Sequence, residues 1–229
     1  MMDIFSSFDP GINMLNSISP SIFWLMIMTT TMLFSLSLWV SPSSMVFIMN
    51  IVMNTMSEQC NRTQGMHIKS FNLFLTSLFI IIIMINFMGL LPAVFSFSSH
   101  LIFTLSFGLP LWMSLIISAM NFNFTSWMAS LLPSGAPHWL NPFLVIIESI
   151  SISVRPLTLS FRLAANMSAG HIVLTLIGCY CAAAMFSSMT STSILFLIQL
   201  GYIMFEMGIC LIQSYIFCLL LSLYSDDHP

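Results

Sequence analysis

The chain has 229 residues, of which 58% are hydrophobic and 5% are charged. With a mean hydropathy of +1.01 it lacks the polar surface of a soluble globule, which predicts an all-α, integral membrane protein that forms a single membrane domain in the lipid bilayer. Four Lys and Arg residues and a formal net charge of -3 leave no basic patch, which argues against a nucleic-acid-binding protein.

The N-terminus and the cysteines point to no targeting or redox function. The opening MMDIFSSFDPG has two acids and no basic residue, so neither a secretory signal nor an Arg-rich transit peptide is expected. A single lysine among 21 Met and 21 Phe residues points, by association, to an organelle-encoded chain. Of five cysteines, only Cys179 and Cys181 are close in sequence, without further ligands at metal spacing, so we expect small buried hydrophobic residues.

The first part of the chain, residues 1–70, is predicted to hold one crossing and one amphipathic segment. Ile22 to Val40 is free of charge, long enough to span a bilayer, and flanked by tryptophans near its ends. Residues 41–70 mix apolar and polar side chains. This pattern predicts an amphipathic helix on one membrane face, followed by a polar loop.

The middle part, residues 71–142, holds two more charge-free runs. Phe71 to Leu91 and Leu101 to Met120 are predicted to cross the membrane as a helical hairpin, with a kink at Pro110. Residues 131–142 contain three prolines, a glycine and a tryptophan, which is typical of an irregular interfacial connection. We expect His138, in this connection, to be a solvated loop residue.

The last part, residues 143–229, has apolar runs at 143–186 and 194–224, separated by a serine-rich turn. As continuous helices these runs would measure about 66 Å and 46 Å, against a hydrocarbon core of about 30 Å. They are therefore predicted to form a long, steeply tilted hairpin. The alternative is a break at Pro156, because proline removes a backbone hydrogen bond.

Few charges are available to predict the orientation. Arg62 and Lys69 lie in the first predicted loop, whereas the N-terminus carries Asp3 and Asp9. The positive-inside rule then puts this loop inside and the N-terminus outside, and five crossings leave the C-terminus inside. The serine-rich turn would lie outside and Glu148 near the inner face.

Polar residues in the last part of the chain require a structural or functional explanation, because placing them inside a bilayer costs free energy. A guanidinium at bilayer depth costs about 2.5 to 3.5 kcal/mol, and Arg162 cannot release its proton to avoid that cost. Asn166 shares a helix face with Arg162, whereas His171 falls on the opposite side, about 14 Å further along. Polar groups that are separated along and around one helix suit two polar pathways better than one binding pocket. The polar candidates are Glu148, Arg155, Arg162, Asn166, His171, Glu206 and Gln213.

Other interpretations remain open at this point. A salt bridge or an interfacial anchor is the alternative for Arg162 and the expected role of Arg155. Small residues around Arg162 allow close approach of another helix, in a partner or in the chain itself. A cytochrome would need paired axial histidines, but only His171 lies well inside a hydrophobic helix. An ion-coupled transporter would show internal repeats or matched broken helices, and none is visible.

The polar residues stand in motifs that resemble one family. RPLTLSFRLAANMSAGH at 155–171 resembles the signature of subunit a of the F-type ATP synthase, as do NFMGLLP at 86–92, VIIESIS at 145–151 and the tail EMGICLIQSYIFCLLLSLY. The resemblance covers residues 71–224. It implies a non-catalytic stator subunit of the Fo sector, in the mitochondrial inner membrane, with its N-terminus in the intermembrane space and its C-terminus in the matrix.

The resemblance also implies partners and roles. The partners would be a rotating c-ring with membrane carboxylates, the peripheral stalk subunit b and other Fo subunits. Glu148 would line the inner of two aqueous half-channels. The chain has no nucleotide-binding loop, so ATP chemistry would belong to partner subunits, and no cofactor is implied.

By the same resemblance, Arg162 is the essential arginine, with Asn166 and Gln213 as its neighbours. His171 and Glu206 would form the polar pair of the outer half-channel, in the arrangement that resembles the mitochondrial one. Counting away from the serine-rich turn predicts that Gln213 lies opposite Arg162 and that Glu206 lies opposite His171.

Overall fold

The fold is described from a computed structural model. It describes residues 44–63, 65, 68, 70–91, 96–132 and 139–226, together with 25 and 29. Within this part every regular element is helical, which confirms the predicted fold class. The elements are α2 (Ser44–Arg62), α3 (Phe71–Gly89), the 3-10 helix η3 (Phe97–Ser99), α4 (Leu101–Phe122), α5 (Phe124–Ser130), α6 (Asn141–Ala184) and α7 (Met189–Asp226). The predicted crossing at 22–40, Lys69 and His138 lie outside the described residues.

Four described helices, α3, α4, α6 and α7, are long and apolar enough to cross a membrane. The chain is therefore a multi-pass membrane protein. Residues 143–186 and 194–224 were predicted as two long helices, and this is confirmed by α6 with 44 residues and α7 with 38. Both are longer than a hydrocarbon core of about 30 Å at 1.5 Å per residue, so they need a tilt to stay within it.

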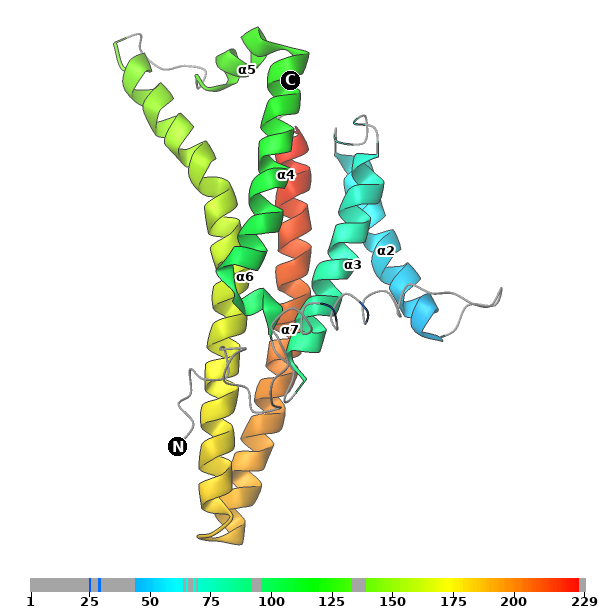
Figure 1. Cartoon of the computed structure of the whole chain (residues 1–229), viewed down its shortest axis with the longest axis vertical. Helices are drawn as coiled ribbons and strands as arrows, with labels where there is room; N and C mark the ends of the chain where they lie inside the picture. Colours follow the sequence, from blue (N-terminus) through cyan, green and yellow to red (C-terminus); the bar gives the residue numbers. More distant parts are fainter. Residues whose placement is uncertain are drawn as a thin grey trace.

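Proline 156 bends α6 without ending it. The helix continues through Pro156, so the alternative of a break there is wrong. Figure 1 shows the N-terminal section of α6 leaning away from the rest of the helix. A proline removes one backbone hydrogen bond and typically leaves such a bend. The carbonyl that loses its backbone donor is the one four residues earlier, at Ile152. The Ser160 hydroxyl donates to the Pro156 carbonyl at 2.8 Å.

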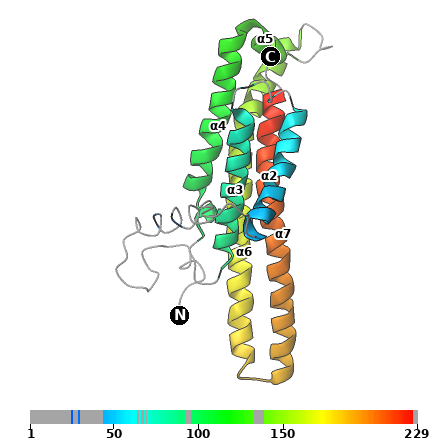
Figure 2. The same cartoon turned by 90° about the vertical axis from the view of Figure 1, so that its right-hand side faces the viewer.

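The helices α6 and α7 form an antiparallel hairpin whose half near the turn projects beyond the other described helices (Figures 1 and 2). The turn is shorter than predicted, because it occupies residues 185–188 and α7 already begins at Met189. Hydroxyls at the start of α7 donate to backbone carbonyls three residues earlier. Ser191 donates to the Ser188 carbonyl at 2.9 Å, and Thr192 donates to the Met189 carbonyl at 2.7 Å.

The helix predicted in residues 41–70 is present as α2, and its amphipathic character stays a prediction. Met56 and Cys60 are buried against α3 and α7, whereas Phe47, Ile48 and Ile51 are exposed. Figure 2 shows α2 beside α3 and α7. Its placement on a membrane face stays a prediction.

The predicted hairpin of residues 71–91 and 101–120 is correct in its chain path and wrong in its packing. The helices α3 and α4 run in opposite directions (Figure 1), but α3 packs on α2 and α7 while α4 packs on α6. Gly108 explains the second contact. A Cβ atom at Gly108 would come within 2.7 Å of the Ser160 hydroxyl, so a larger residue there would require this hydroxyl to move.

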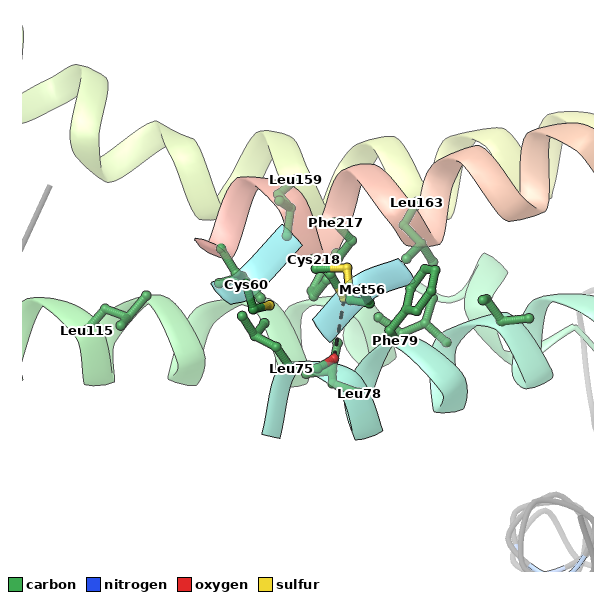
Figure 3. Close-up of a cluster of buried hydrophobic side chains, with 13 residues drawn as sticks. Met56, Cys60, Leu75, Leu78, Phe79, Leu115, Leu159, Leu163, Phe217 and Cys218 are labelled. Atoms are coloured by element: carbon green, nitrogen blue, oxygen red, sulfur yellow. Dashed lines mark hydrogen bonds between the residues drawn. The ribbon is translucent and has the colours of Figure 1, made fainter. Parts of the chain in front are cut away.

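Apolar side chains from five helices meet in one cluster, shown in Figure 3. Lipid is as apolar as leucine, so close van der Waals contact holds these helices together more than transfer out of water does. Four of the five cysteines are buried, as predicted, and Cys218 lies 3.9 Å from the Leu75 carbonyl. Cys179 is exposed, so the prediction was wrong for that residue.

Candidate functional site

The side chain of Arg162 is exposed on the outer surface of α6. Within the described residues no acidic group pairs with it, since the one salt bridge found there involves other residues. The alternative of an arginine salt-bridged within the chain is therefore wrong for the described part. Ala165 and Ala169 follow on the same exposed face, and their small side chains leave the guanidinium accessible to a neighbouring protein.

One turn after Arg162, a polar bridge joins the two long helices. The Asn166 amide donates to the Gln213 side-chain oxygen at 2.9 Å. Gln213 is only 5% exposed, so this hydrogen bond satisfies an amide that has little access to solvent. Gln213 was predicted opposite Arg162, and its observed partner is one turn further along α6.

Glu206 on α7 is 2% exposed. Its carboxylate lies against the backbone of Gly170, and a Cβ atom at Gly170 would collide with the carboxylate oxygens. Tyr202 stands one turn earlier on α7, on the same helix face as Glu206. Among the described residues, the Oε1 oxygen of Glu206 has no hydrogen-bond partner. A glycine on α6 thus creates the space for a buried acid on α7.

His171 follows Gly170 directly, so Glu206 and His171 lie at the same level of the hairpin. The His171 ring donates a hydrogen bond to the backbone carbonyl of Gly89 at the end of α3. The hairpin register is further fixed by Cys210, whose sulfur lies 3.6 Å from that of Met167. Glu206 was predicted to lie opposite His171, and it lies opposite Gly170, one residue earlier on α6.

A second polar region lies at the other end of α6. Glu148 and Arg155 form a salt bridge of 3.7 Å, and the Arg155 guanidinium lies 5.3 Å from the centre of the Tyr224 ring. The predicted salt bridge of Arg155 is confirmed. These three residues line an open cavity of about 340 Å³, together with Trp112 and Trp127.

Charge and spacing divide α6 into three levels. Glu148 lies 14 positions before Arg162 and His171 lies nine positions after it, which corresponds to about 21 Å and about 14 Å of helix. The exposed cation thus stands between an open acidic cavity and a buried carboxylate. Two separate polar regions with a fixed positive charge between them can carry a proton on either side while preventing a direct path through the middle.

Sequence reasoning missed two polar residues. Tyr202 was not predicted, although its position four residues before Glu206 places the two side chains on one helix face. Asn86 in α3 is fully buried, and within the described residues neither atom of its amide has a partner. The signal for Asn86 was an amide inside the apolar stretch of residues 78–91.

Comparison with known proteins gives matches over almost the whole chain. The family model described as ATP synthase A chain matches residues 18–226. ATP synthase subunit a of Artemia franciscana is 37% identical over 227 residues, covering 99% of this chain and 100% of that protein. The subunits a of Locusta migratoria and Anopheles gambiae are 36% and 37% identical, and in both cases 99% of each chain is covered.

Proposed function

Since the chain belongs to the ATP synthase A chain family and is the non-catalytic, proton-translocating stator subunit of the Fo sector, we propose that Arg162 faces the carboxylates of a rotating c-ring and separates two aqueous half-channels. The family resemblance noted in the sequence is confirmed. The observation that carries the proposal is the exposed guanidinium of Arg162, which has no ion pair among the described residues.

The chemistry of arginine suits this role. A fixed positive charge favours the ionised form of any carboxylate that comes within about 4 to 6 Å, so a rotor carboxylate releases its proton as it approaches Arg162. The guanidinium does not give up its own proton, so protons do not pass from one half-channel to the other through it. The hydrogen bond between Asn166 and Gln213 holds α6 and α7 together one turn away from Arg162. It thereby keeps the guanidinium at a fixed position along the hairpin.

In this proposal the outer half-channel uses Glu206 and His171. Support comes from the buried carboxylate at Gly170 and from the imidazole at the same level, which is held by the Gly89 carbonyl. A buried ionisable group inside a membrane helix normally marks an ion pathway.

The inner half-channel, in the same proposal, uses Glu148. Its support is the open cavity of about 340 Å³, which admits water to a carboxylate that is 38% exposed. The neighbouring Arg155 balances its charge without closing the cavity.

The proposal also includes the location and partners of the chain. It places the chain in the mitochondrial inner membrane, with the N-terminus in the intermembrane space and the C-terminus in the matrix. Besides the c-ring, the peripheral stalk subunit b and other Fo subunits would contact it. The exposed apolar surface of the projecting α6–α7 half, for example Phe196, Leu197 and Met204, supports contact with lipid or with such partners.

The test is proton-driven ATP synthesis by the intact complex in vesicles. Arg162→Ala removes the fixed charge and is expected to abolish synthesis, while the complex still assembles. Arg162→Lys is expected to lose most of the activity, because an ammonium is compact, strongly hydrated and able to lose its proton. Synthesis near the wild-type rate in the alanine variant would overturn the proposal.

A further inference from the structure

The Arg155 side chain contacts both long helices of the hairpin. Its Nη2 atom lies 3.7 Å from the Oε1 atom of Glu148, two turns earlier on its own helix, α6. Its guanidinium carbon lies 5.3 Å from the centre of the Tyr224 ring on α7. One cation therefore joins the carboxylate of the proposed inner half-channel to the C-terminal end of the other long helix.

The salt bridge alone is a weak restraint on Glu148. The side chains of Arg155 and Glu148 are 35% and 38% exposed, and ion pairs with such access to solvent contribute little, because two long side chains lose conformational freedom to form them. Contact with an aromatic face removes part of this freedom in advance, since the planar guanidinium of arginine stacks on such faces. The Tyr224 contact therefore makes the salt bridge more persistent than the ion pair would be on its own.

Tyr224 is in turn held by the hydrophobic core. Its ring packs against the cluster of buried side chains in Figure 3, which includes Leu221 one turn earlier on α7. Arg155 directly precedes Pro156, where α6 bends and its N-terminal section leans away from the rest of the helix (Figure 1). Glu148 stands in this leaning section, so the contacts through Arg155 and Tyr224 connect its carboxylate to the core.

We propose that Tyr224 and Arg155 are positioning residues for proton transfer in the inner half-channel: Tyr224 fixes the guanidinium, and the guanidinium holds the Glu148 carboxylate at the wall of the cavity that all three residues line. This inference rests on the proposed role of Glu148. The cavity of about 340 Å³ has room for several water molecules, so an unrestrained carboxylate would sample several rotamers in it. A fixed carboxylate keeps one place at which protons are exchanged with the inner water.

The test measures proton-driven ATP synthesis by the intact complex in vesicles, as a rate per assembled complex. Tyr224→Leu removes the aromatic face and is expected to slow synthesis on the order of fivefold, whereas Tyr224→Phe keeps the face and is expected to lose much less. Arg155→Lys keeps a cation over the ring and is expected to retain more activity than Arg155→Gln. Tyr180→Leu is the matched control, because Tyr180 is an exposed tyrosine of α6 that does not line the cavity. Its rate is expected to equal that of the wild type.

Double variants separate the possible results. If Tyr224 acts through Arg155 and Glu148, Tyr224→Leu causes no further slowing in Arg155→Gln or in Glu148→Gln. If Tyr224→Leu does not assemble, Arg155→Gln provides the same test, because it is expected to be slow alone and to add nothing to Glu148→Gln.

A wild-type rate in Tyr224→Leu, equal slowing in Tyr224→Phe and Tyr224→Leu, or additive slowing in the double variants would overturn the inference. The role of Glu148 stands in each of these cases, provided that Glu148→Gln is slow. A normal rate in Glu148→Gln would overturn the role of Glu148 and the inference together.

Discussion

The Glu206 carboxylate lies directly against the backbone of Gly170, so a buried acid on α7 faces a glycine on α6. Any side chain at position 170 would displace the carboxylate. The acid and the glycine therefore form one structural unit, and neither position can change without affecting the other.

Gly170→Ala is predicted to displace Glu206 and to slow proton-driven ATP synthesis strongly. Glycine to alanine in a helix normally gains up to about 1 kcal/mol in helix propensity, so a loss has to come from the collision with the carboxylate. Gly178→Ala on the same helix is the control, because a Cβ atom there meets nothing within 4 Å. Equal rates in the two variants, measured in vesicles, would show that the close approach has no functional importance.

A second prediction concerns the bridge between Asn166 and Gln213. Asn166→Ala leaves the buried Gln213 amide without its partner, which is expected to cost about 1 to 3 kcal/mol and to lower the melting temperature of the purified complex. Asn72→Ala, which breaks the exposed 3.0 Å hydrogen bond to Asn61, is expected to cost much less. If the two variants melt alike, the bridge does not stabilise the hairpin.

Much of the α6–α7 hairpin could be predicted from the sequence, because length and polar spacing are local properties. Apolar runs interrupted by Arg162, Glu206 and Gln213 predict two long helices and their approximate register. The exact partner of Gln213 could not be predicted, since counting from the turn gives the register only to within a few residues. The packing of α4 on α6 includes a close approach between Gly108 and Ser160 that no periodicity in the sequence predicts.

A third prediction concerns Cys60 in α2, which lies outside the four candidate membrane spans. Burial raises the pKa of the Cys60 thiol above its ordinary value, so the folded chain keeps this proton at a pH where the unfolded chain has lost it. The resulting stability is fully present below the thiol's ordinary pKa, of about 8.5, and is lost as pH rises above it.

The measurement is the melting temperature of the complex between pH 7 and pH 10. It is expected to fall at the alkaline end, and to fall less in Cys60→Ala. Labelling with iodoacetamide at pH 7.5 supplies a second readout: the exposed Cys179 is expected to react while the buried Cys60 does not. Fast labelling of Cys60 in the folded complex would contradict the packing of α2 against α3 and α7.

A fourth prediction concerns Asn86, whose side chain is fully buried in α3. Neither amide atom has a hydrogen-bond partner within the described residues, and the same holds for the hydroxyl of Ser98 nearby. Both residues line a small void of about 10 Å³ among apolar side chains such as Leu163 and Phe217. Each unsatisfied buried group is expected to cost about 1 to 3 kcal/mol.

Asn86→Leu replaces the amide by an apolar side chain of similar size, so it is expected to leave the melting temperature of the complex unchanged or to raise it. Asn86→Asp is the opposite change, because it can place a charge in the same apolar surroundings, and it is expected to lower the melting temperature. Melting of the leucine variant several degrees below the wild type would show that the Asn86 amide is satisfied in the assembled complex. Normal melting combined with lost proton flux would instead assign the amide a part in transport, one turn from the Gly89 carbonyl that holds His171.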